Sequence, residues 1–132
     1  MRRNVYSKRV ELYGEEHEDT LKEAVNYGNC LGCSERLGEA KSLLRKTVPV
    51  ARRVCGENDE ITLRVKLTYA MALYRDTGAS LDDLRESVTR LEDLERVTRR
   101  VLGGAHPITT GVELRLQESR AALRARETPS PG

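Results

Sequence analysis

The sequence predicts an all-α fold in which amphipathic helices stack in two layers. Three observations lead to this prediction. Two blocks of residues recur in the same order along the 132-residue chain, at offsets of 42 and then 47 positions. The apolar residues between these blocks follow the i, i+3, i+4 spacing of helices. Only 38% of the residues are hydrophobic, with no Trp or Phe, and 33% are charged. This composition suits helices that each bury one stripe, rather than a spherical core.

The repeat is clearest at three turns that begin with glycine. They read GEEHEDTL from Gly14, GENDEITL from Gly56 and GGAHPITT from Gly103. A second block recurs in phase with them. Arg-Arg-Val precedes the last two turns at 52–54 and 99–101, and VELY at 10–13 holds the equivalent place before the first. Two blocks that recur in order indicate a repeated structural unit.

The first three predicted helices span about 3–13, 17–33 and 36–55. Gly14 follows the first of them, where a left-handed glycine cap is expected. The second carries Leu21, Ala24 and Val25 at helical spacing, and the third shows the same period from Leu37 onward. We expect the first helix to be the end of a preceding unit.

The last three predicted helices span about 59–77, 81–102 and 107–126. Gly56 and Gly103 are expected to cap the helices before them. Ser80 is expected to cap the start of the fifth helix, and Pro107 to be the first residue of the sixth. The predicted repeat domain covers 1–127, with units at 14–55 and 56–102 and a closing helix in 103–127. The tail 128–132 is expected to be disordered.

Most of residues 8–126 resemble the tetratricopeptide repeats of the kinesin light chain type. The resemblance rests on the family pattern Gly-x-x-His-Pro-x-Thr-Leu, followed by an Asn-Leu-Ala helix and a Gly-Arg-x-x-Glu-Ala helix. The first unit matches through His17, Asp19, Thr20, Leu21, NYGNCL at 26–31 and RLGEA at 36–40. The second keeps Thr62, Leu63, Ala70, Gly78 and Leu81, and the third keeps His106, Pro107 and Thr109. The resemblance implies a right-handed superhelical solenoid of antiparallel helix pairs, with about two and a half repeats.

In this family the first helices of the pairs line a concave groove, where an asparagine holds the main chain of an extended peptide. An amide can both donate to and accept from a peptide backbone. Asn26 matches that asparagine, and Thr68 and Arg115 stand at the equivalent positions of the later units. Helical geometry and the repeat place the candidate groove residues as Lys22, Asn26, Asn29, Arg64, Thr68, Met71, Arg75 and Arg115. Because several of these are cationic, we expect an acidic partner segment.

Other kinds of site receive little support. Cys30 and Cys33 form a CxxC, but a structural zinc site needs four ligands, and Cys55, His17 and His106 belong to different turns. The two histidines share one repeat position, so each is expected to cap or pack at a helix start. There is no phosphate-binding loop and no nucleophile elbow. We therefore expect neither enzymatic activity, nor a metal, nor a cofactor.

Charge and hydropathy limit the remaining partners. The formal net charge is +2, from 23 basic and 21 acidic residues, which gives no general attraction to nucleic acid. Apolar runs are far too short to span a membrane. Without a secretory signal at the N-terminus, and with an odd number of cysteines, a cytoplasmic location is expected. The predicted function is a protein-interaction scaffold. The alternatives are a self-assembly module that forms a homodimer and a regulatory repeat segment of a larger protein.

Overall fold

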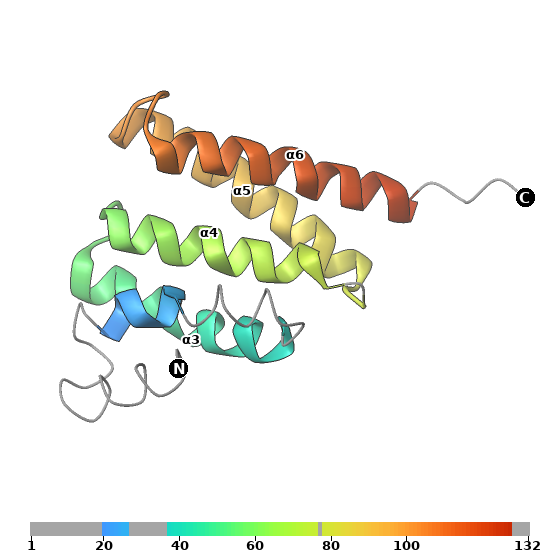
Figure 1. Cartoon of the computed structure of the whole chain (residues 1–132), viewed down its shortest axis with the longest axis horizontal. Helices are drawn as coiled ribbons and strands as arrows, with labels where there is room; N and C mark the ends of the chain where they lie inside the picture. Colours follow the sequence, from blue (N-terminus) through green and yellow to red (C-terminus); the bar gives the residue numbers. More distant parts are fainter. Residues whose placement is uncertain (1–19, 27–36, 77, 128–132) are drawn as a thin grey trace, which may run out of the picture.

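A computed structural model describes residues 20–26, 37–76 and 78–127 of the chain (Figure 1). In these ranges the ordered elements are all helices and there is no β-strand, which confirms the all-α prediction for them. Residues 20–26 are helical, and the remaining helices are α3 (Leu37–Cys55), α4 (Glu60–Arg75), α5 (Leu81–Val101) and α6 (Pro107–Glu127). The predicted helix at 3–13, the flanks of the helix predicted at 17–33 and the tail lie outside the described residues.

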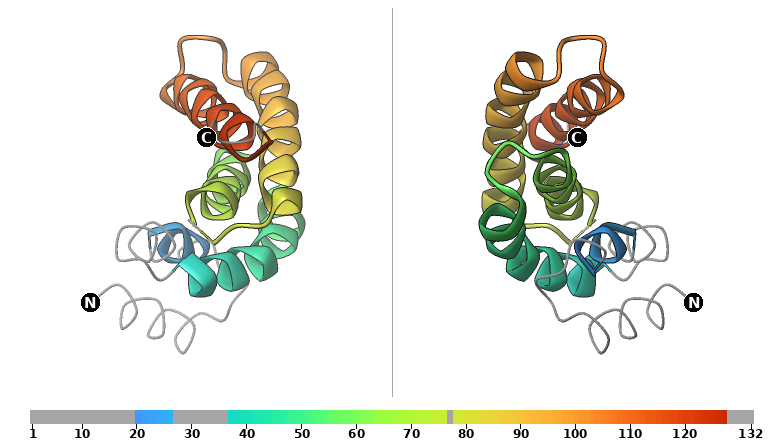
Figure 2. Two further views of the ribbon diagram at one scale, coloured as in Figure 1. Left: turned by 90° about the vertical axis from the view of Figure 1, so that its right-hand side faces the viewer. Right: turned by 90° about the vertical axis from the view of Figure 1, so that its left-hand side faces the viewer.

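The helices form two rows (Figure 2). Residues 20–26, α4 and α6 lie in one row, while α3 and α5 lie in the other. Helix α4 packs against α3, α5 and α6, and α5 also packs against α6. Within the described part of the chain, no helix is long and apolar enough to cross a lipid bilayer.

Helix α4 lies between two hydrophobic clusters because both of its sides carry apolar residues. One side contributes Val65 and Tyr69 to a cluster with α3 and Leu21. The other side contributes Leu63 and Ala70 to a cluster with α5 and α6. Its hydrophobic contacts therefore tie the N-terminal part of the described structure to the C-terminal part.

The two described glycine turns have the same backbone geometry. Gly56 and Gly103 have φ values of 104° and 92°, the left-handed conformation expected of glycine caps. The N–H of Gly56 donates to the carbonyl of Arg52, and that of Gly103 donates to the carbonyl of Arg99, both at 3.1 Å. The structure thus confirms both predicted caps. Gly14 lies outside the described residues.

Helix starts also follow the predicted signals. The hydroxyl of Ser80 accepts from the N–H of Asp83 at 3.0 Å, so Ser80 caps α5. Helix α6 begins at Pro107, whose missing N–H costs no helical hydrogen bond there. The imidazole of His106 accepts from the N–H of Ile108 at 3.1 Å, so His106 caps the start of α6 as expected.

The repeat extends into the burial pattern of α4 and α6. Val65 and Val112, 47 positions apart, are both fully buried. On the other side of the helices the pattern differs. Leu63 of α4 is fully buried, whereas the equivalent Thr110 of α6 is exposed. Where α4 packs against later helices, α6 therefore presents a mostly polar face, on which Leu114 is 48% exposed.

Candidate functional site

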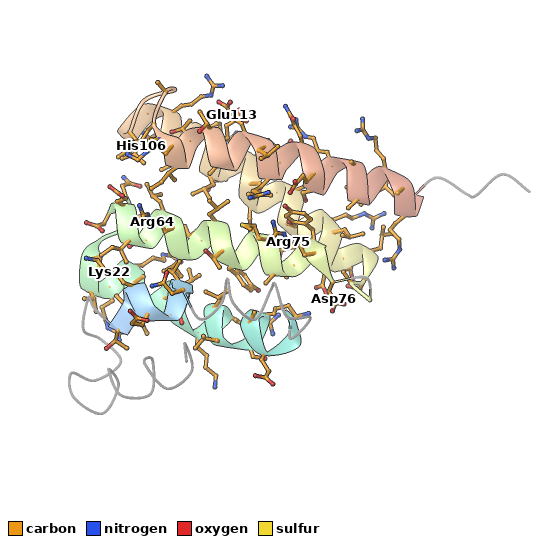
Figure 3. All side chains as sticks on the ribbon, in the orientation of Figure 1. Lys22, Arg64, Arg75, Asp76, His106 and Glu113 are labelled. Carbon is orange, nitrogen blue, oxygen red and sulfur yellow. The ribbon has the colours of Figure 1, made fainter. Side chains whose placement is uncertain are left out.

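Three of the residues predicted to line a groove meet around one pocket. Lys22 and Asn26 come from the helical stretch 20–26, and Arg64 comes from the second turn of α4. The cavity has a volume of about 460 Å³, and its other lining residues are Val25, Asp59, Glu60 and Ile61. Figure 3 labels Lys22 and Arg64 on their two helices. Residues from two separate helices thus contribute to one site.

The charges around this pocket are balanced. Lys22 and Arg64 supply two cations, and Asp59 and Glu60 supply two carboxylates. Arg64 forms an i, i+4 ion pair with Glu60 at 3.1 Å, and both side chains remain about half exposed. The Asp59 carboxylate accepts from the N–H of Ile61 at 2.9 Å and so caps α4. The pocket therefore gives no net electrostatic preference for an acidic ligand.

The remaining predicted residues of α4 differ in their exposure. Thr68 is only 6% exposed, and its hydroxyl donates to the carbonyl of Arg64 in the same helix. The structure therefore does not bring Thr68 to the surface that it was expected to line. Met71 is half-buried and packs against the cluster shared by α4, α5 and α6. Arg75 is exposed toward the other end of α4 from Arg64 (Figure 3).

Arg115 belongs to a polar junction between α4 and α6. Its guanidinium binds both carboxylate oxygens of Glu118, at 3.1 and 3.2 Å. The hydroxyl of Tyr74 donates to the same carboxylate at 2.5 Å. Arg115 is thus already paired, whereas we had expected it to offer its charge to a ligand. The contact between Tyr74 and Glu118 could not be predicted from the sequence, because it depends on how two separate helices pack.

This junction shifts the protonation of both acidic partners. Burial, together with the hydrogen bond to Glu118, raises the pKa of Tyr74 to about 12. The hydrogen bond from Tyr74, with a further one from Arg115, lowers the pKa of Glu118 below its ordinary value. The charge of Arg75 also acts on Glu118 in the same direction, so Arg75 lies close enough to influence the junction.

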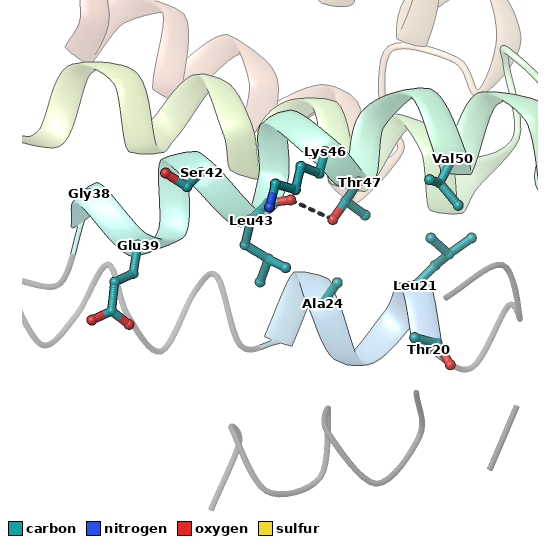
Figure 4. Close-up of a pocket in the computed structure, with 10 residues that line it drawn as sticks. All are labelled: Thr20, Leu21, Ala24, Gly38, Glu39, Ser42, Leu43, Lys46, Thr47 and Val50. Atoms are coloured by element: carbon teal, nitrogen blue, oxygen red, sulfur yellow. Dashed lines mark hydrogen bonds between the residues drawn. The ribbon is translucent and has the colours of Figure 1, made fainter. Parts of the chain in front are cut away.

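A second pocket, of about 680 Å³, lies between residues 20–26 and α3 (Figure 4). Its walls are largely aliphatic, with Leu21 and Ala24 facing Leu43 and Val50. Lys46 and Glu39 are its charged lining residues. The hydroxyl groups of Thr20, Ser42 and Thr47 complete the polar part of this lining.

The predicted cysteine and groove positions are only partly described. Cys55 is half-buried and packs against the cluster between α3 and α4. Cys30, Cys33 and Asn29 lie outside the described residues. Among the residues that the structure does describe, no group of three or more His, Cys, Asp or Glu side chains is placed to hold a metal ion.

Comparisons of the chain with protein-family models, curated proteins and solved structures found no match. The resemblance to tetratricopeptide repeats therefore rests on the sequence motifs.

Proposed function

We propose that the chain is a tetratricopeptide-type repeat domain, similar to those of kinesin light chains, and that it acts as a non-enzymatic scaffold. In this proposal, residues 20–26, α4 and α6 are the first helices of successive antiparallel pairs in a solenoid. A peptide segment of a partner protein binds along this row. The pocket where Lys22, Asn26 and Arg64 meet supports the proposal most directly, because the repeat pattern predicts that these three residues line one groove.

The chemistry of the pocket suits an extended peptide. Asn26 offers an amide that can both donate to and accept from a main chain, whatever the peptide's sequence. Val25 and Ile61 provide apolar surface beside it. Affinity would come from main-chain hydrogen bonds and from burial of one apolar side chain, in a site that is open rather than enclosed.

That the partner segment is acidic remains a prediction. The pocket does not support it, because its two cations are balanced by two carboxylates. Among the predicted groove cations, Arg64 is paired with Glu60, and Arg115 is paired with Glu118. An acidic preference would therefore depend on Arg75 more than on Arg64 and Arg115. A salt titration of the bound peptide measures this dependence.

The scaffold proposal can be tested without knowing the partner. A library of random displayed peptides is selected on the wild-type chain, and the enriched peptides are measured by fluorescence anisotropy. Asn26→Ala combined with Arg64→Glu should weaken them by about tenfold or more, the loss of roughly one to two hydrogen bonds. The matched control is Arg96→Glu, which breaks a similar exposed ion pair, with Asp93 on α5. The proposal fails if no peptide is enriched, or if both variants weaken binding equally.

Self-assembly is the alternative, and exposed Leu114 on the outer face of α6 is the observation in its favour. The same face carries the exposed polar residues Thr110 and Gln117, which weakens the case for a hydrophobic dimer interface. Light scattering over a range of concentrations distinguishes the two functions. A mass that rises with concentration in the wild type, and does not rise in Leu114→Glu, would support self-assembly.

A further inference from the structure

Three ion pairs connect α5 to α6, and each joins residues of opposite charge: Arg85 with Glu127, Glu92 with Arg120, and Arg99 with Glu113. On both helices these residues are seven positions apart, which is about two turns, so the pairs form a ladder along the contact between the helices. The sign of the charge alternates along each helix. A shift of α6 by seven residues would place Arg120 opposite Arg85 and Glu113 opposite Glu92. The ladder is therefore complementary only in the observed register.

The two halves of α6 differ in how deeply they are buried. The buried residues of this helix all lie in 108–119, and they are Ile108, Thr109, Val112, Leu116 and Ser119. Beyond Ser119, the described side chains that pack against the cluster shared with α4 and α5 are Ala122 and Leu123, and both are half-buried. Residues 120–127, the C-terminal segment of α6, therefore have less hydrophobic packing to hold them than 108–119 have.

The C-terminal segment of α6 contributes to two of the three ion pairs in the ladder. Arg120 lies 2.9 Å from Glu92, and Glu127 lies 3.5 Å from Arg85. All four side chains are about half exposed, so dissolved salt can screen these pairs. A single exposed ion pair contributes little to stability, whereas several charges that form a network contribute more. Ion pairs thus supply a larger share of the contact energy for this segment than for 108–119.

We infer that the C-terminal segment of α6 is an ionic latch, which lies against α5 at low ionic strength and is released as the salt concentration rises. The buried residues of 108–119 keep the rest of α6 in place, because salt does not screen hydrophobic packing. Release would uncover Leu123 and leave Arg85 and Glu92 of α5 without their partners on α6. The surface that α5 presents would therefore depend on ionic strength. This inference does not depend on the proposed peptide binding.

Amide hydrogen exchange of the whole chain, followed by NMR, tests the inference at two concentrations of sodium chloride, about 0.1 M and about 1 M, between which the Debye length falls from about 10 Å to about 3 Å. The quantity compared is the protection of amides 120–124 divided by that of amides 112–116, so that effects of salt common to both cancel. Glu92→Gln removes the central ion pair of the ladder. Asp93→Asn is the matched control, because it neutralises the neighbouring carboxylate, which binds Arg96 within α5.

In the wild type we expect this protection ratio to fall several-fold at the higher salt concentration, because the ladder is screened. Glu92→Gln should already show a lower ratio at the lower concentration, and its ratio should respond less to added salt. Asp93→Asn should behave like the wild type, because its ion pair does not join α6 to α5. The inference would be overturned by a wild-type ratio that does not change with salt, or by equal effects of Glu92→Gln and Asp93→Asn.

Discussion

Thr62 and Thr109 occupy the same place in α4 and α6, yet only the hydroxyl of Thr62 has a hydrogen-bond partner in the described structure. Both residues are fully buried. The Thr62 hydroxyl lies 2.7 Å from the carbonyl oxygen of Gly56 and 3.1 Å from that of Ala51. It therefore joins the start of α4 to the end of α3 and to the turn between them. At Thr109 a buried hydroxyl is left without an acceptor.

Replacing each threonine by valine should accordingly give unequal results. Thr62→Val removes a buried hydrogen bond at nearly constant volume, and should lower the free energy of unfolding by about 1 to 2 kcal/mol. Thr109→Val removes an unpaired polar group, and should be neutral or stabilising by up to about 1 kcal/mol. Urea denaturation of the two variants measures the difference. Equal destabilisation would show that the two hydroxyls are in equivalent environments.

Gly103 and Gly111 should respond in opposite directions to the same substitution. Gly103 has a φ of 92°, so alanine there is strained, and Gly103→Ala should cost about 1 kcal/mol. Gly111 lies inside α6, where the nearest atom to an added Cβ is Cδ2 of Leu67 at 4.0 Å. Gly111→Ala should therefore stabilise the fold by about 0.5 to 1 kcal/mol through helix propensity. Thermal unfolding followed by circular dichroism compares them. A stabilising Gly103→Ala would contradict the described turn.

The junction of Tyr74 with Glu118 should make stability depend on pH in two windows. Because the pKa of Tyr74 is raised to about 12, the folded chain keeps this proton where an unfolded tyrosine has lost it. That contribution is complete below about pH 10 and is lost as the pH rises toward 12. The pKa of Glu118 is lowered, so its contribution is complete above the ordinary pKa of glutamate. It is lost as the pH falls through the lowered value.

Tyr74→Phe should remove the alkaline loss, which is of order 2 kcal/mol, and should reduce the acid loss. Tyr69→Phe is the control, because Tyr69 is also buried but its hydroxyl accepts from Arg45 instead of donating to a carboxylate. Unfolding free energies across both windows give the measurement. If Tyr74→Phe loses as much unfolding free energy at alkaline pH as the wild type does, this junction is not the cause of the loss.

The sequence predicted the described helices well because their ends carry local signals. The helix predicted at about 59–77 is Glu60–Arg75, and that predicted at about 81–102 is Leu81–Val101. Gly56, Ser80 and Pro107 each act within a few residues of their own position, so a single stretch of sequence is enough to place them. The shared offset of 47 also predicted which positions of α4 and α6 are equivalent.

The candidate site could be predicted only in part, because pairing between helices is not a local property. Helical spacing and the repeat predicted that Lys22 and Arg64 face the same side of the fold, and both residues line one pocket. They did not predict that Thr68 would be buried. Nor did they predict the ion pairs of Arg64 with Glu60 and of Arg115 with Glu118, although both lie within one helix, at i, i+4 and i, i+3 spacing. The number of cations on one helix face therefore exceeds the number that a ligand can use, because neighbouring carboxylates pair with some of them.

The proposed peptide binding along the row formed by residues 20–26, α4 and α6 can be tested by an NMR titration of the ¹⁵N-labelled chain with a peptide selected on it. We expect amide shifts concentrated at Lys22, Asn26, Arg64 and Met71, with little change at the exposed positions of α5 such as Arg96. Shifts concentrated on α5, with the amides of residues 22–26 and 60–75 unchanged, would contradict it.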